Sequence, residues 1–457
     1  MPRGFKLAPR SDGDGAGSSV WQPDRRNLLL LTLCILLHAV PFFSRPALIG
    51  GDEPHYALMA HSIAVDGSLD PLPGYRRIEA GSAEAGRKFA GKRLDRHLAT
   101  QGSRQVFIHP FGLPALAAPF VGVLAALSPQ APPDLVLEGL TLTVTFLALL
   151  AGWSLLVGEM GNVRDATILA FGLYFSTPLW YYSRTFFTEP YMWSFVVLGV
   201  WCVTRRRWLA ASLMLAFACV MKETAVLLVI PIGAFVWRRQ GFRSVVRLAP
   251  FPLLFAVAYF FKNWFLYGRI LVTFQPYGLG DPLAGTLGVL FDSRHGLLPF
   301  APVLILAVAG WAVFKPGRRS LDDRSLLSLA AFLAWFAVTA CWVDWRGGSC
   351  YGPRLMVPAI MALVLPICRC WQRFADDRRF RVISYALIVL GFAIQWRAGT
   401  KPFAAFWSIS LSELLFGAPI ATLAGLVVGG MLLWFLPRLA VAARLRQPVA
   451  DSEANLG

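Results

Sequence analysis

The chain has 457 residues, of which 56% are hydrophobic and only 15% are charged. Soluble domains carry charge on roughly a quarter of their residues, so the composition excludes an ordinary soluble protein and predicts a membrane protein. The net charge is +17, but the basic residues occur in short clusters between apolar blocks, as in the cytoplasmic loops of membrane proteins. Because they are not gathered on one face, nucleic acid is not an expected partner.

Apolar blocks close to the length that crosses a bilayer, about 20 residues, recur along the chain. With the basic clusters on the cytoplasmic side, they predict an all-α polytopic membrane protein with about 12 transmembrane helices and both termini in the cytoplasm. The predicted spans are 27–43, 135–157, 167–182, 190–204, a helical hairpin at 208–237, then 248–266, 297–314, 326–343, 355–370, 382–396 and 414–436.

The predicted domain organisation is a single transmembrane domain at 27–437 between two cytoplasmic tails. Residues 1–26 are rich in glycine and polar residues, so we expect that tail to be disordered. The second tail is 438–457. Residues 44–109 form a large first loop on the extracytoplasmic side, and 53–65 within it has the apolar spacing of an amphipathic helix that can lie in the membrane interface.

The apolar stretch 110–127 is expected to begin and end on the same outer side. The span before it ends on that side, and the span after it must begin there to bring the later basic clusters to the cytoplasm. It is therefore predicted to be a re-entrant or interfacial helix, whose backbone must line a cavity or lie buried in protein. A normal span beside a miscounted neighbour is the alternative.

Two adjacent carboxylates, Asp52 and Glu53, follow the first span. Sugar transfer needs a base for the proton of the acceptor hydroxyl, and cations or a metal for the departing phosphate. A carboxylate at the lipid–water boundary suits a donor with its tail in lipid and its sugar in water. The alternative is a plain helix start, since acidic residues and Pro54 stabilise a first helical turn.

Further polar residues are expected on the same outer side. Arg and Lys bind phosphate, and ionisable residues at membrane depth usually mark function; for each cation, snorkelling to the interface is the alternative. The candidates for substrate or phosphate binding are Lys222, Arg184, Arg354, Tyr351, His109, Glu189 and Arg294, with Lys262 as a further cation.

The segment 345–354 (WRGGSCYGPR) groups several of these features. Its glycines allow backbone N–H groups to approach an anion, and Trp345 could stack on a sugar. A tight outer turn in which Arg354 anchors a span is the alternative.

A divalent cation is a possible cofactor, because His55, His109 and His295 could join Asp52 or Glu53 around it. Nothing in their spacing demands a metal, so no metal ligand is assigned and no cofactor is certain. Interfacial hydrogen bonding is the alternative for these histidines.

Several motifs, in this order, resemble those of C-type membrane glycosyltransferases, the family 39-like group of protein O-mannosyltransferases and the transferases that move aminoarabinose onto lipid A. The stretch GDEPHYALMAHSIAVDGSLD resembles the first-loop motif, in which Asp52 matches the catalytic carboxylate. The triplet IHP at 108–110 resembles the element that opens an interfacial helix, although Phe111 stands where the family has a second proline. YYSR and TEP, at 181–190, resemble a Tyr-Ser-Arg…Glu segment, and MKET at 221–224 resembles a hairpin lysine.

The resemblance implies an inverting glycosyltransferase of the bacterial inner membrane, with a polyprenyl-phosphate sugar donor, a lipid or glycan acceptor of the cell envelope, and membrane lipids around it. Asp52 would be the general base, with Glu53 supporting it or holding the acceptor; Lys222, Arg184 and Arg354 would hold the phosphate. A lipid-linked sugar flippase or transporter, which would place charges at mid-membrane depth, is one alternative. A polysaccharide polymerase or ligase, which would use a large late loop, is the other.

Overall fold

The computed structural model describes residues 25–43, 50–80, 94–101, 104–129, 131, 133–270, 278–313, 323–348, 350–401, 406 and 409–444. Most of the expected N-terminal tail, 1–24, and the last part of the C-terminal one, 445–457, lie outside the described residues. The chain is already helical at Arg25, and its last helix continues past the expected boundary at 437 to Arg444.

The segment after the first helix, α1 (Arg25–Phe43), is built from short elements. They are α2 (Glu53–His61), a π turn (Ser62–Asp66), α3 (Leu72–Glu79) and the antiparallel strands β1 (Leu98–Gln101) and β2 (Arg104–Phe107). In the two-stranded sheet, Leu98 pairs with Phe107 and Gln101 pairs with Arg104. The described chain is mostly helical, as predicted, but this sheet corrects the all-α expectation.

The helix α2 confirms a helix near 53–65 but not its predicted amphipathic position. Every residue from Glu53 to Ala60 is buried, because α2 packs against α5 (Gly112–Leu127) and Tyr56 meets the rings of Phe107 and Phe186 edge-on. The predicted position in the membrane interface was wrong, because the spacing of apolar residues indicates which of them are buried but not whether lipid or protein covers them. The neighbouring α3 does have two faces, with Tyr75 buried and Arg76 exposed.

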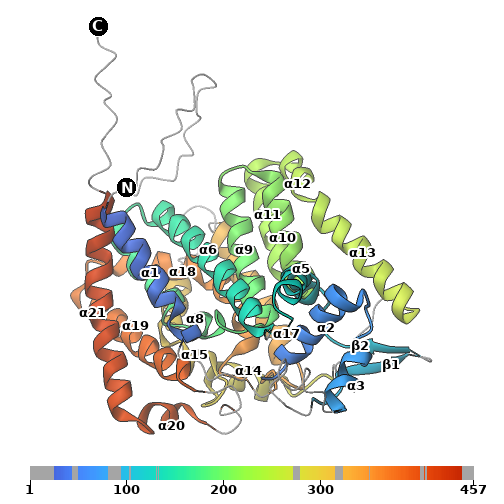
Figure 1. Ribbon diagram of the computed structural model, residues 1–457. Coiled ribbons are helices and arrows are strands. Elements are labelled where there is room, and N and C mark those ends of the chain that lie inside the picture. The colour runs from blue at the N-terminus through green and yellow to red at the C-terminus, as the bar shows by residue number, and fades with distance from the viewer. Residues whose placement is uncertain are drawn as a thin grey trace.

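The remaining helices form a bundle (Figure 1). In chain order they are α6 (Asp134–Met160), α7 (Val163–Tyr174), α8 (Pro178–Tyr182), α9 (Thr188–Thr204), α10 (Trp208–Met221), α11 (Val226–Gln240), α12 (Phe242–Leu248), α13 (Pro250–Tyr267), α14 (Pro282–Phe291), α15 (Leu297–Phe300), α16 (Ile305–Ala312), α17 (Asp323–Ala340), α18 (Ile360–Phe374), α19 (Arg378–Gly399), α20 (Leu411–Phe416) and α21 (Pro419–Arg444).

Three helices of the described chain are long and apolar enough to cross a membrane: Val136–Met160, Arg378–Gly399 and Pro419–Ala442. A fourth span arises if α12 and α13, which meet at a bend of 50°, are counted together. By length and composition the chain is thus a multi-pass membrane protein, while the described helices do not show the predicted number of about 12 spans.

Two predicted spans are broken in the structure, which accounts for part of that difference. The stretch at 167–182 divides at Thr177, and the stretch at 297–314 divides at Ala301. A proline follows each break, and the residue before a proline is disfavoured in the α conformation. Both residues have non-helical backbones, with φ −130° at Thr177 and φ −143° at Ala301.

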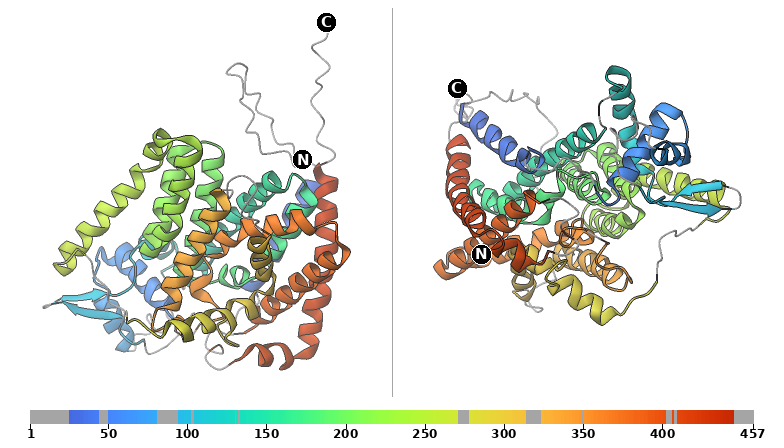
Figure 2. Two further views of the ribbon diagram at one scale, coloured as in Figure 1. Left: turned by 180° about the vertical axis from the view of Figure 1, so that it is seen from behind. Right: turned by 60° about the horizontal axis from the view of Figure 1, so that its bottom comes forward.

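The bundle has two distinct ends, which Figure 1 and Figure 2 show from different sides. The short elements α2, α3, β1 and β2 gather at one end, and α12 lies at the other. The helix α9 packs against α6 and α10 and connects the two ends. The predicted helical hairpin is confirmed as α10 and α11, which are separated at Lys222 by an extended residue and one 3₁₀ turn, Glu223–Ala225.

Candidate active site

A cavity of about 320 Å³ lies at the end of the bundle that carries α2 and the two strands. Its walls come from the start of α2, the approach to α5, the first turn of α9, the break between α10 and α11, and one side of α13. The polar and aromatic residues that line it are Asp52, Tyr56, His109, Phe111, Thr188, Glu189, Lys222, Glu223, Phe255, Tyr259, Lys262, Asn263, Tyr267, Trp342 and Arg354.

Asp52 occupies the position immediately before α2. Gly51, with φ +57°, provides the left-handed turn that precedes it, and the carbonyl of Asp52 accepts the N–H groups of His55 and Tyr56. Its side chain makes no capping hydrogen bond to the helix. A helix therefore does begin here, as the alternative interpretation of Asp52 and Glu53 expected. Only the backbone of Asp52 takes part in the first helical turn, and its carboxylate lines the cavity.

The carboxylate of Asp52 meets a cation from the far end of the sequence. Arg354 Nη1 donates to Asp52 Oδ2 at 3.1 Å, and Arg354 Nε lies 3.7 Å from Glu189 Oε1. The same oxygen of Glu189 lies 3.7 Å from Lys222 Nζ. Two carboxylates and two cations thus form one connected network along the cavity wall, and the guanidinium also lies over the ring of Phe187 at 4.8 Å.

The network determines the charge of Asp52. Burial would raise the pKa of this carboxyl, but the positive charge of Arg354, followed by His109, His97 and His55, outweighs it and holds the pKa at about 2. Burial lowers the pKa of His109 to about 4, so its imidazole is neutral at pH 7. At neutral pH the cavity therefore presents an ionised carboxylate beside fixed cations and a neutral histidine.

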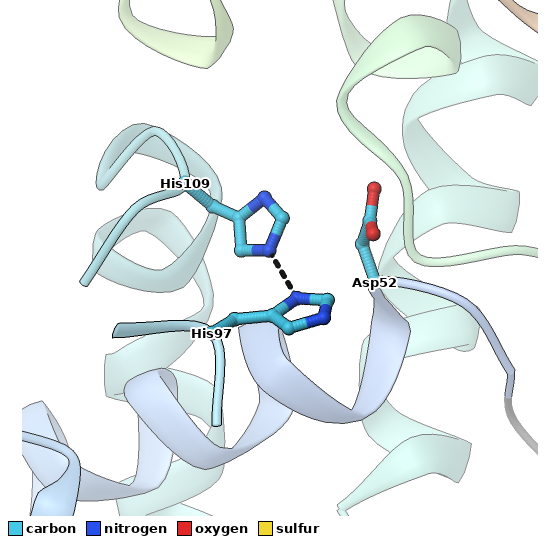
Figure 3. A group of neighbouring side chains, drawn as sticks. All are labelled: Asp52, His97 and His109. Carbon is cyan, nitrogen blue, oxygen red and sulfur yellow. Dashed lines mark hydrogen bonds between the residues drawn. The ribbon is translucent and has the colours of Figure 1, made fainter. Parts of the chain in front are cut away.

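A histidine cluster lies directly beside Asp52. His97 Nδ1 and His109 Nε2 are 2.7 Å apart, and Figure 3 shows the two rings facing one another with the Asp52 carboxylate close by. His55 stacks on His97 with 3.6 Å between ring centroids, and its Nδ1 is 2.6 Å from the hydroxyl of Tyr75. The predicted contribution of His295 does not arise, because that side chain lies beside Asp292 in another loop, 3.4 Å away.

Asp52, His97 and His109 fit a metal site by geometry and by donor chemistry. One ligand atom from each residue lies within 4.8 Å of the others. Two imidazole nitrogens and a carboxylate oxygen are a set that zinc accepts. In the structure the two ring nitrogens share a hydrogen bond at 2.7 Å, which a bound cation would replace. Of the three histidines considered from the sequence, only His109 belongs to this group.

Glu53 is buried and engaged by the backbone. Gly50 N–H donates to Glu53 Oε2 at 2.9 Å, and Phe186 N–H donates to Glu53 Oε1 at 2.8 Å. These bonds join α2 to the loop before α9, the loop that leads to Glu189. The geometry favours a positioning role for Glu53, and it does not line the cavity.

Three other predicted binding residues lie away from the cavity. Arg184 is buried and donates to the carbonyls of Gly399 at 2.6 Å and Lys401 at 3.1 Å. Tyr351 is buried and donates from its hydroxyl to Gln395 Oε1 at 2.9 Å. Arg294 is exposed in the loop after α14. The cavity thus brings together Asp52, His109, Glu189, Lys222 and Arg354, while Arg184, Tyr351 and Arg294 do not line it.

Arg354 reaches the cavity because the loop at 345–354 turns sharply. Gly347, Gly348 and Gly352 all have positive φ, between +52° and +74°, a backbone conformation that a residue with a Cβ adopts only at a cost. Gly348 N–H donates to Asp344 Oδ1 at 3.3 Å. In this structure the glycines shape the turn that delivers Arg354, and Arg354 itself supplies the charge.

Lys262, on α13, also lines the cavity and lies among three aromatic rings. Its Nζ lies 5.0 Å from the ring centroid of Tyr259, 5.3 Å from that of Phe111 and 5.8 Å from that of Tyr267. Such cation–π contacts hold an ammonium group while leaving its N–H donors available to an anion. The phenylalanine that departs from the family motif thus helps to position a cation.

His97 is the functional candidate that the sequence reasoning missed. A turn-forming Gly-Ser pair stands between LATQ and RQVF, which is a hairpin signal. The register of that hairpin places His97 opposite Ile108, whose N–H donates to the carbonyl of His97 at 3.3 Å. The hairpin thus brings the two segments together, and His97 Nδ1 lies 2.7 Å from His109 Nε2. Recognising the hairpin would have predicted that the segments meet, but not the contact between these two side chains, because successive residues of a strand point to opposite faces.

No protein-family model and no curated protein sequence matches the chain. In structure, the chain is similar to ArnT from Cupriavidus metallidurans. The match to the crystal structure of ArnT in the apo state has 17% sequence identity and a TM-score of 0.49, and it covers 91% of this chain and 74% of that chain. The match to the crystal structure of ArnT bound to undecaprenyl phosphate has 16% identity and a TM-score of 0.46, and it covers 91% of this chain and 76% of that chain.

Proposed function

We propose that this chain is a membrane glycosyltransferase that moves a sugar from a polyprenyl-phosphate-linked donor to a lipid or glycan acceptor of the cell envelope. The observation that carries the proposal is the convergence of Asp52, Arg354 and Lys222 on one cavity. Transfer of a sugar from a phosphate needs a carboxylate near the acceptor hydroxyl and cations near the phosphate. The order of the family-like sequence motifs supports the same reaction.

The donor phosphate would bind between Arg354 and Lys222. Both cations are already held by Glu189, at 3.7 Å each, so they are positioned before the substrate arrives. Lys262 faces the same cavity from α13 and would supply a third positive charge. Fixed cations of this kind stabilise the charge that develops on the phosphate as the sugar leaves.

Asp52 would act as the base once the donor has bound. In the structure its carboxylate is paired with Arg354, and a donor phosphate competes with Asp52 for that guanidinium. The acceptor hydroxyl oxygen then forms a bond to the anomeric carbon and its proton passes to Asp52. The bond from the anomeric carbon to the phosphate oxygen breaks, and its electron pair stays on the polyprenyl phosphate.

A divalent cation is the cofactor that the residues around Asp52 would accept. His97, His109 and one oxygen of Asp52 would hold it, leaving the other oxygen of Asp52 to receive the proton, and the cation would add positive charge beside the departing phosphate. His55 and Tyr75, which contact His97 or each other, would fix the orientation of the rings, as outer hydrogen-bond partners do in metal sites.

The protein would work in the bacterial inner membrane with its cavity on the extracytoplasmic side. Arg205 follows the end of α9, which carries Glu189 in its first turn, and Arg238 lies in the last turn of α11, which follows the break at Lys222. Loops rich in Arg remain on the cytoplasmic side, and this arrangement supports a cavity on the extracytoplasmic side.

Purified full-length protein in detergent micelles provides the test. It would be mixed with a lipid extract containing polyprenyl-phosphate sugars and with an envelope acceptor extract, and the products would be followed by mass spectrometry. We expect an acceptor that gains the mass of one sugar, together with an equal amount of released polyprenyl phosphate. A transporter forms no such product in micelles, so absence of transfer by folded protein would contradict the proposal.

A further inference from the structure

A second cavity, of about 590 Å³, lies at the other end of α9. Glu189, in the first turn of α9, lines the first cavity, and Thr204, in the last turn, lines the second. At 1.5 Å per residue, these positions are roughly 22 Å apart along the helix. No described residue lines both cavities, so the second is a separate site.

The walls of this second cavity are mainly apolar. They come from the facing sides of α6, α9, α11, α17 and α18, and they include Leu156, Leu228, Ile232, Phe235 and Ala331. Its volume falls in the range of about 300–1,000 Å³ that is typical of ligand sites. A cavity with such walls, between helices of a membrane protein, suits a hydrocarbon chain better than water.

The rim of the cavity is cationic. Arg205, Arg206 and Arg324 line it together with one carboxylate, Glu159. The negative charge of Glu159 is balanced by two guanidinium groups, because its carboxylate oxygens lie 3.3 Å from Arg324 Nη1 and 3.7 Å from Arg369 Nη2. The rim therefore has an excess of positive charge beside an apolar interior, which is complementary to an anionic group on an apolar chain.

Arg205 is fixed in place at this rim. Its guanidinium stacks on the ring of Trp201 at 3.9 Å, and its Nη2 donates to Ser154 Oγ at 2.9 Å. These contacts connect the end of α9 to α6 and hold the charge at the rim of the cavity.

Arg206 provides a second, independent observation. Among the described residues it is the only one other than glycine with a positive φ, +56°. It stands just after α9 in a helix-ending turn, where Arg206 N–H donates to the carbonyl of Val203 and Arg207 N–H donates to that of Cys202. Glycine is the usual residue there because it adopts this conformation without steric cost. A residue other than glycine in this conformation is a candidate for a function of its side chain.

We propose that this cavity binds an anionic diacyl phospholipid, with an acyl chain between the helices and the phosphate at Arg205 and Arg206. Basic pockets between transmembrane helices on the cytoplasmic side bind such headgroups, and the cytoplasmic side is where the arginine clusters are expected. The proposal does not depend on the reaction at Asp52.

The test measures lipid binding by the full-length protein in detergent micelles with native mass spectrometry. The probes are phosphatidylglycerol and phosphatidylcholine with identical acyl chains. We expect phosphatidylglycerol to bind at least tenfold more tightly. R205Q and R206G should each weaken its binding about fivefold, the effect of one basic residue near an anionic headgroup. Both variants should weaken phosphatidylcholine binding less, because the ammonium group of that headgroup already offsets the charge of its phosphate.

The controls separate the site from general charge and from unfolding. R207Q removes the same charge from the neighbouring residue, which does not line the cavity, and should bind phosphatidylglycerol as the wild type does. R206G should be at least as heat-stable as the wild type, because glycine suits the left-handed turn. A331F, which fills the apolar interior, should weaken binding of both lipids.

Three results would overturn the proposal. The first is equal affinity for the two lipids, since the rim would then not recognise charge. The second is unchanged phosphatidylglycerol binding by R206G. The third is displacement of phosphatidylglycerol by an equimolar amount of polyprenyl phosphate, which would identify a different occupant.

Discussion

Arg354 Nη1 lies 3.1 Å from Asp52 Oδ2, although 302 positions separate the two residues in sequence. Asp52 comes from the first loop of the chain and Arg354 from a glycine-rich turn that precedes α18. Their contact closes one side of the cavity, so neither loop forms the candidate site alone. The pair also links the carboxylate that would receive a proton to a cation that would hold the phosphate.

Replacing Arg354 by glutamine is expected to lower the rate of sugar transfer by about 10²–10³-fold. Removing one fixed hydrogen-bond donor from the site where negative charge develops in the transition state usually has an effect of this size. It also leaves Asp52 and Glu189 as close carboxylates without their shared cation, which should destabilise the protein by about 3–5 kcal/mol. Initial rates with the purified enzyme and thermal unfolding would measure the two effects.

The double variant D52N/R354Q separates these two effects. Removing the charge of Asp52 relieves the unpaired carboxylate, so heat stability should recover in part while transfer stays at least as low as in R354Q. Recovery of transfer in the double variant would contradict the role given to both residues.

Replacing Glu53 by glutamine is expected to affect stability first. A glutamine side chain has one acceptor oxygen, so one of the two N–H groups, of Gly50 or of Phe186, loses its buried partner. An unsatisfied buried group costs about 1–3 kcal/mol, and thermal unfolding would show it. The matched control is E413Q, an exposed glutamate that accepts the N–H of Ser410, where a change within about 0.5 kcal/mol is expected. If E53Q abolished transfer with unchanged stability, Glu53 would be a catalytic residue after all.

Gly112 tests the fit of α5 against α10. A Cβ added there would lie 1.9 Å from the carbonyl oxygen of Val220, a backbone atom. G112A should therefore push the two helices apart, at a cost of about 1–3 kcal/mol, and distort the cavity that both residues line. The control on the same helix is G122A, whose Cβ would meet only the Cβ of Ala64 at 3.6 Å. Equal thermal stability of the two variants would show that the approach of α5 to α10 is not tight.

The proposed metal site at Asp52, His97 and His109 predicts zinc binding that does not depend on activity. After dialysis against zinc and then against buffer, the wild type should retain about one zinc per chain by elemental analysis. H97A and H109A each remove a ligand and should bind zinc at least tenfold more weakly, since loss of even an outer partner costs that much. H295A is the control, because His295 lies beside Asp292 and outside the group. Undiminished zinc in H97A would rule out this set of ligands.

Much of the helical framework could be predicted from the sequence because it depends on local composition. The predicted spans at 27–43 and 190–204 differ by only two residues at one end from α1 and α9. In both cases an apolar run ends at a polar or arginine-rich stretch, and this signal needs no knowledge of the rest of the fold. The break between α10 and α11 at Lys222 was predictable for a similar reason, since the apolar run is too long for one span.

The organisation of the site could be predicted only in part because it depends on contacts between distant segments. Hydropathy shows that Arg184 and Arg354 are unusual, but not that Arg184 caps carbonyls near Gly399 while Arg354 reaches Asp52. It also cannot show that protein covers α2 on every side. His97 escaped notice because its contact with His109 forms only when the hairpin of β1 and β2 has brought the two segments together.

The rate of sugar transfer by D52N, compared with the wild type and with D66N, tests the central claim most directly. Asp66 is a carboxylate of the same loop that pairs with Arg77 at the surface, so D66N matches the change of charge without touching the cavity. The account predicts that D52N loses transfer by at least 10²-fold, in the range of a missing general base, while D66N keeps wild-type activity and both variants fold. Wild-type transfer by folded D52N would contradict it.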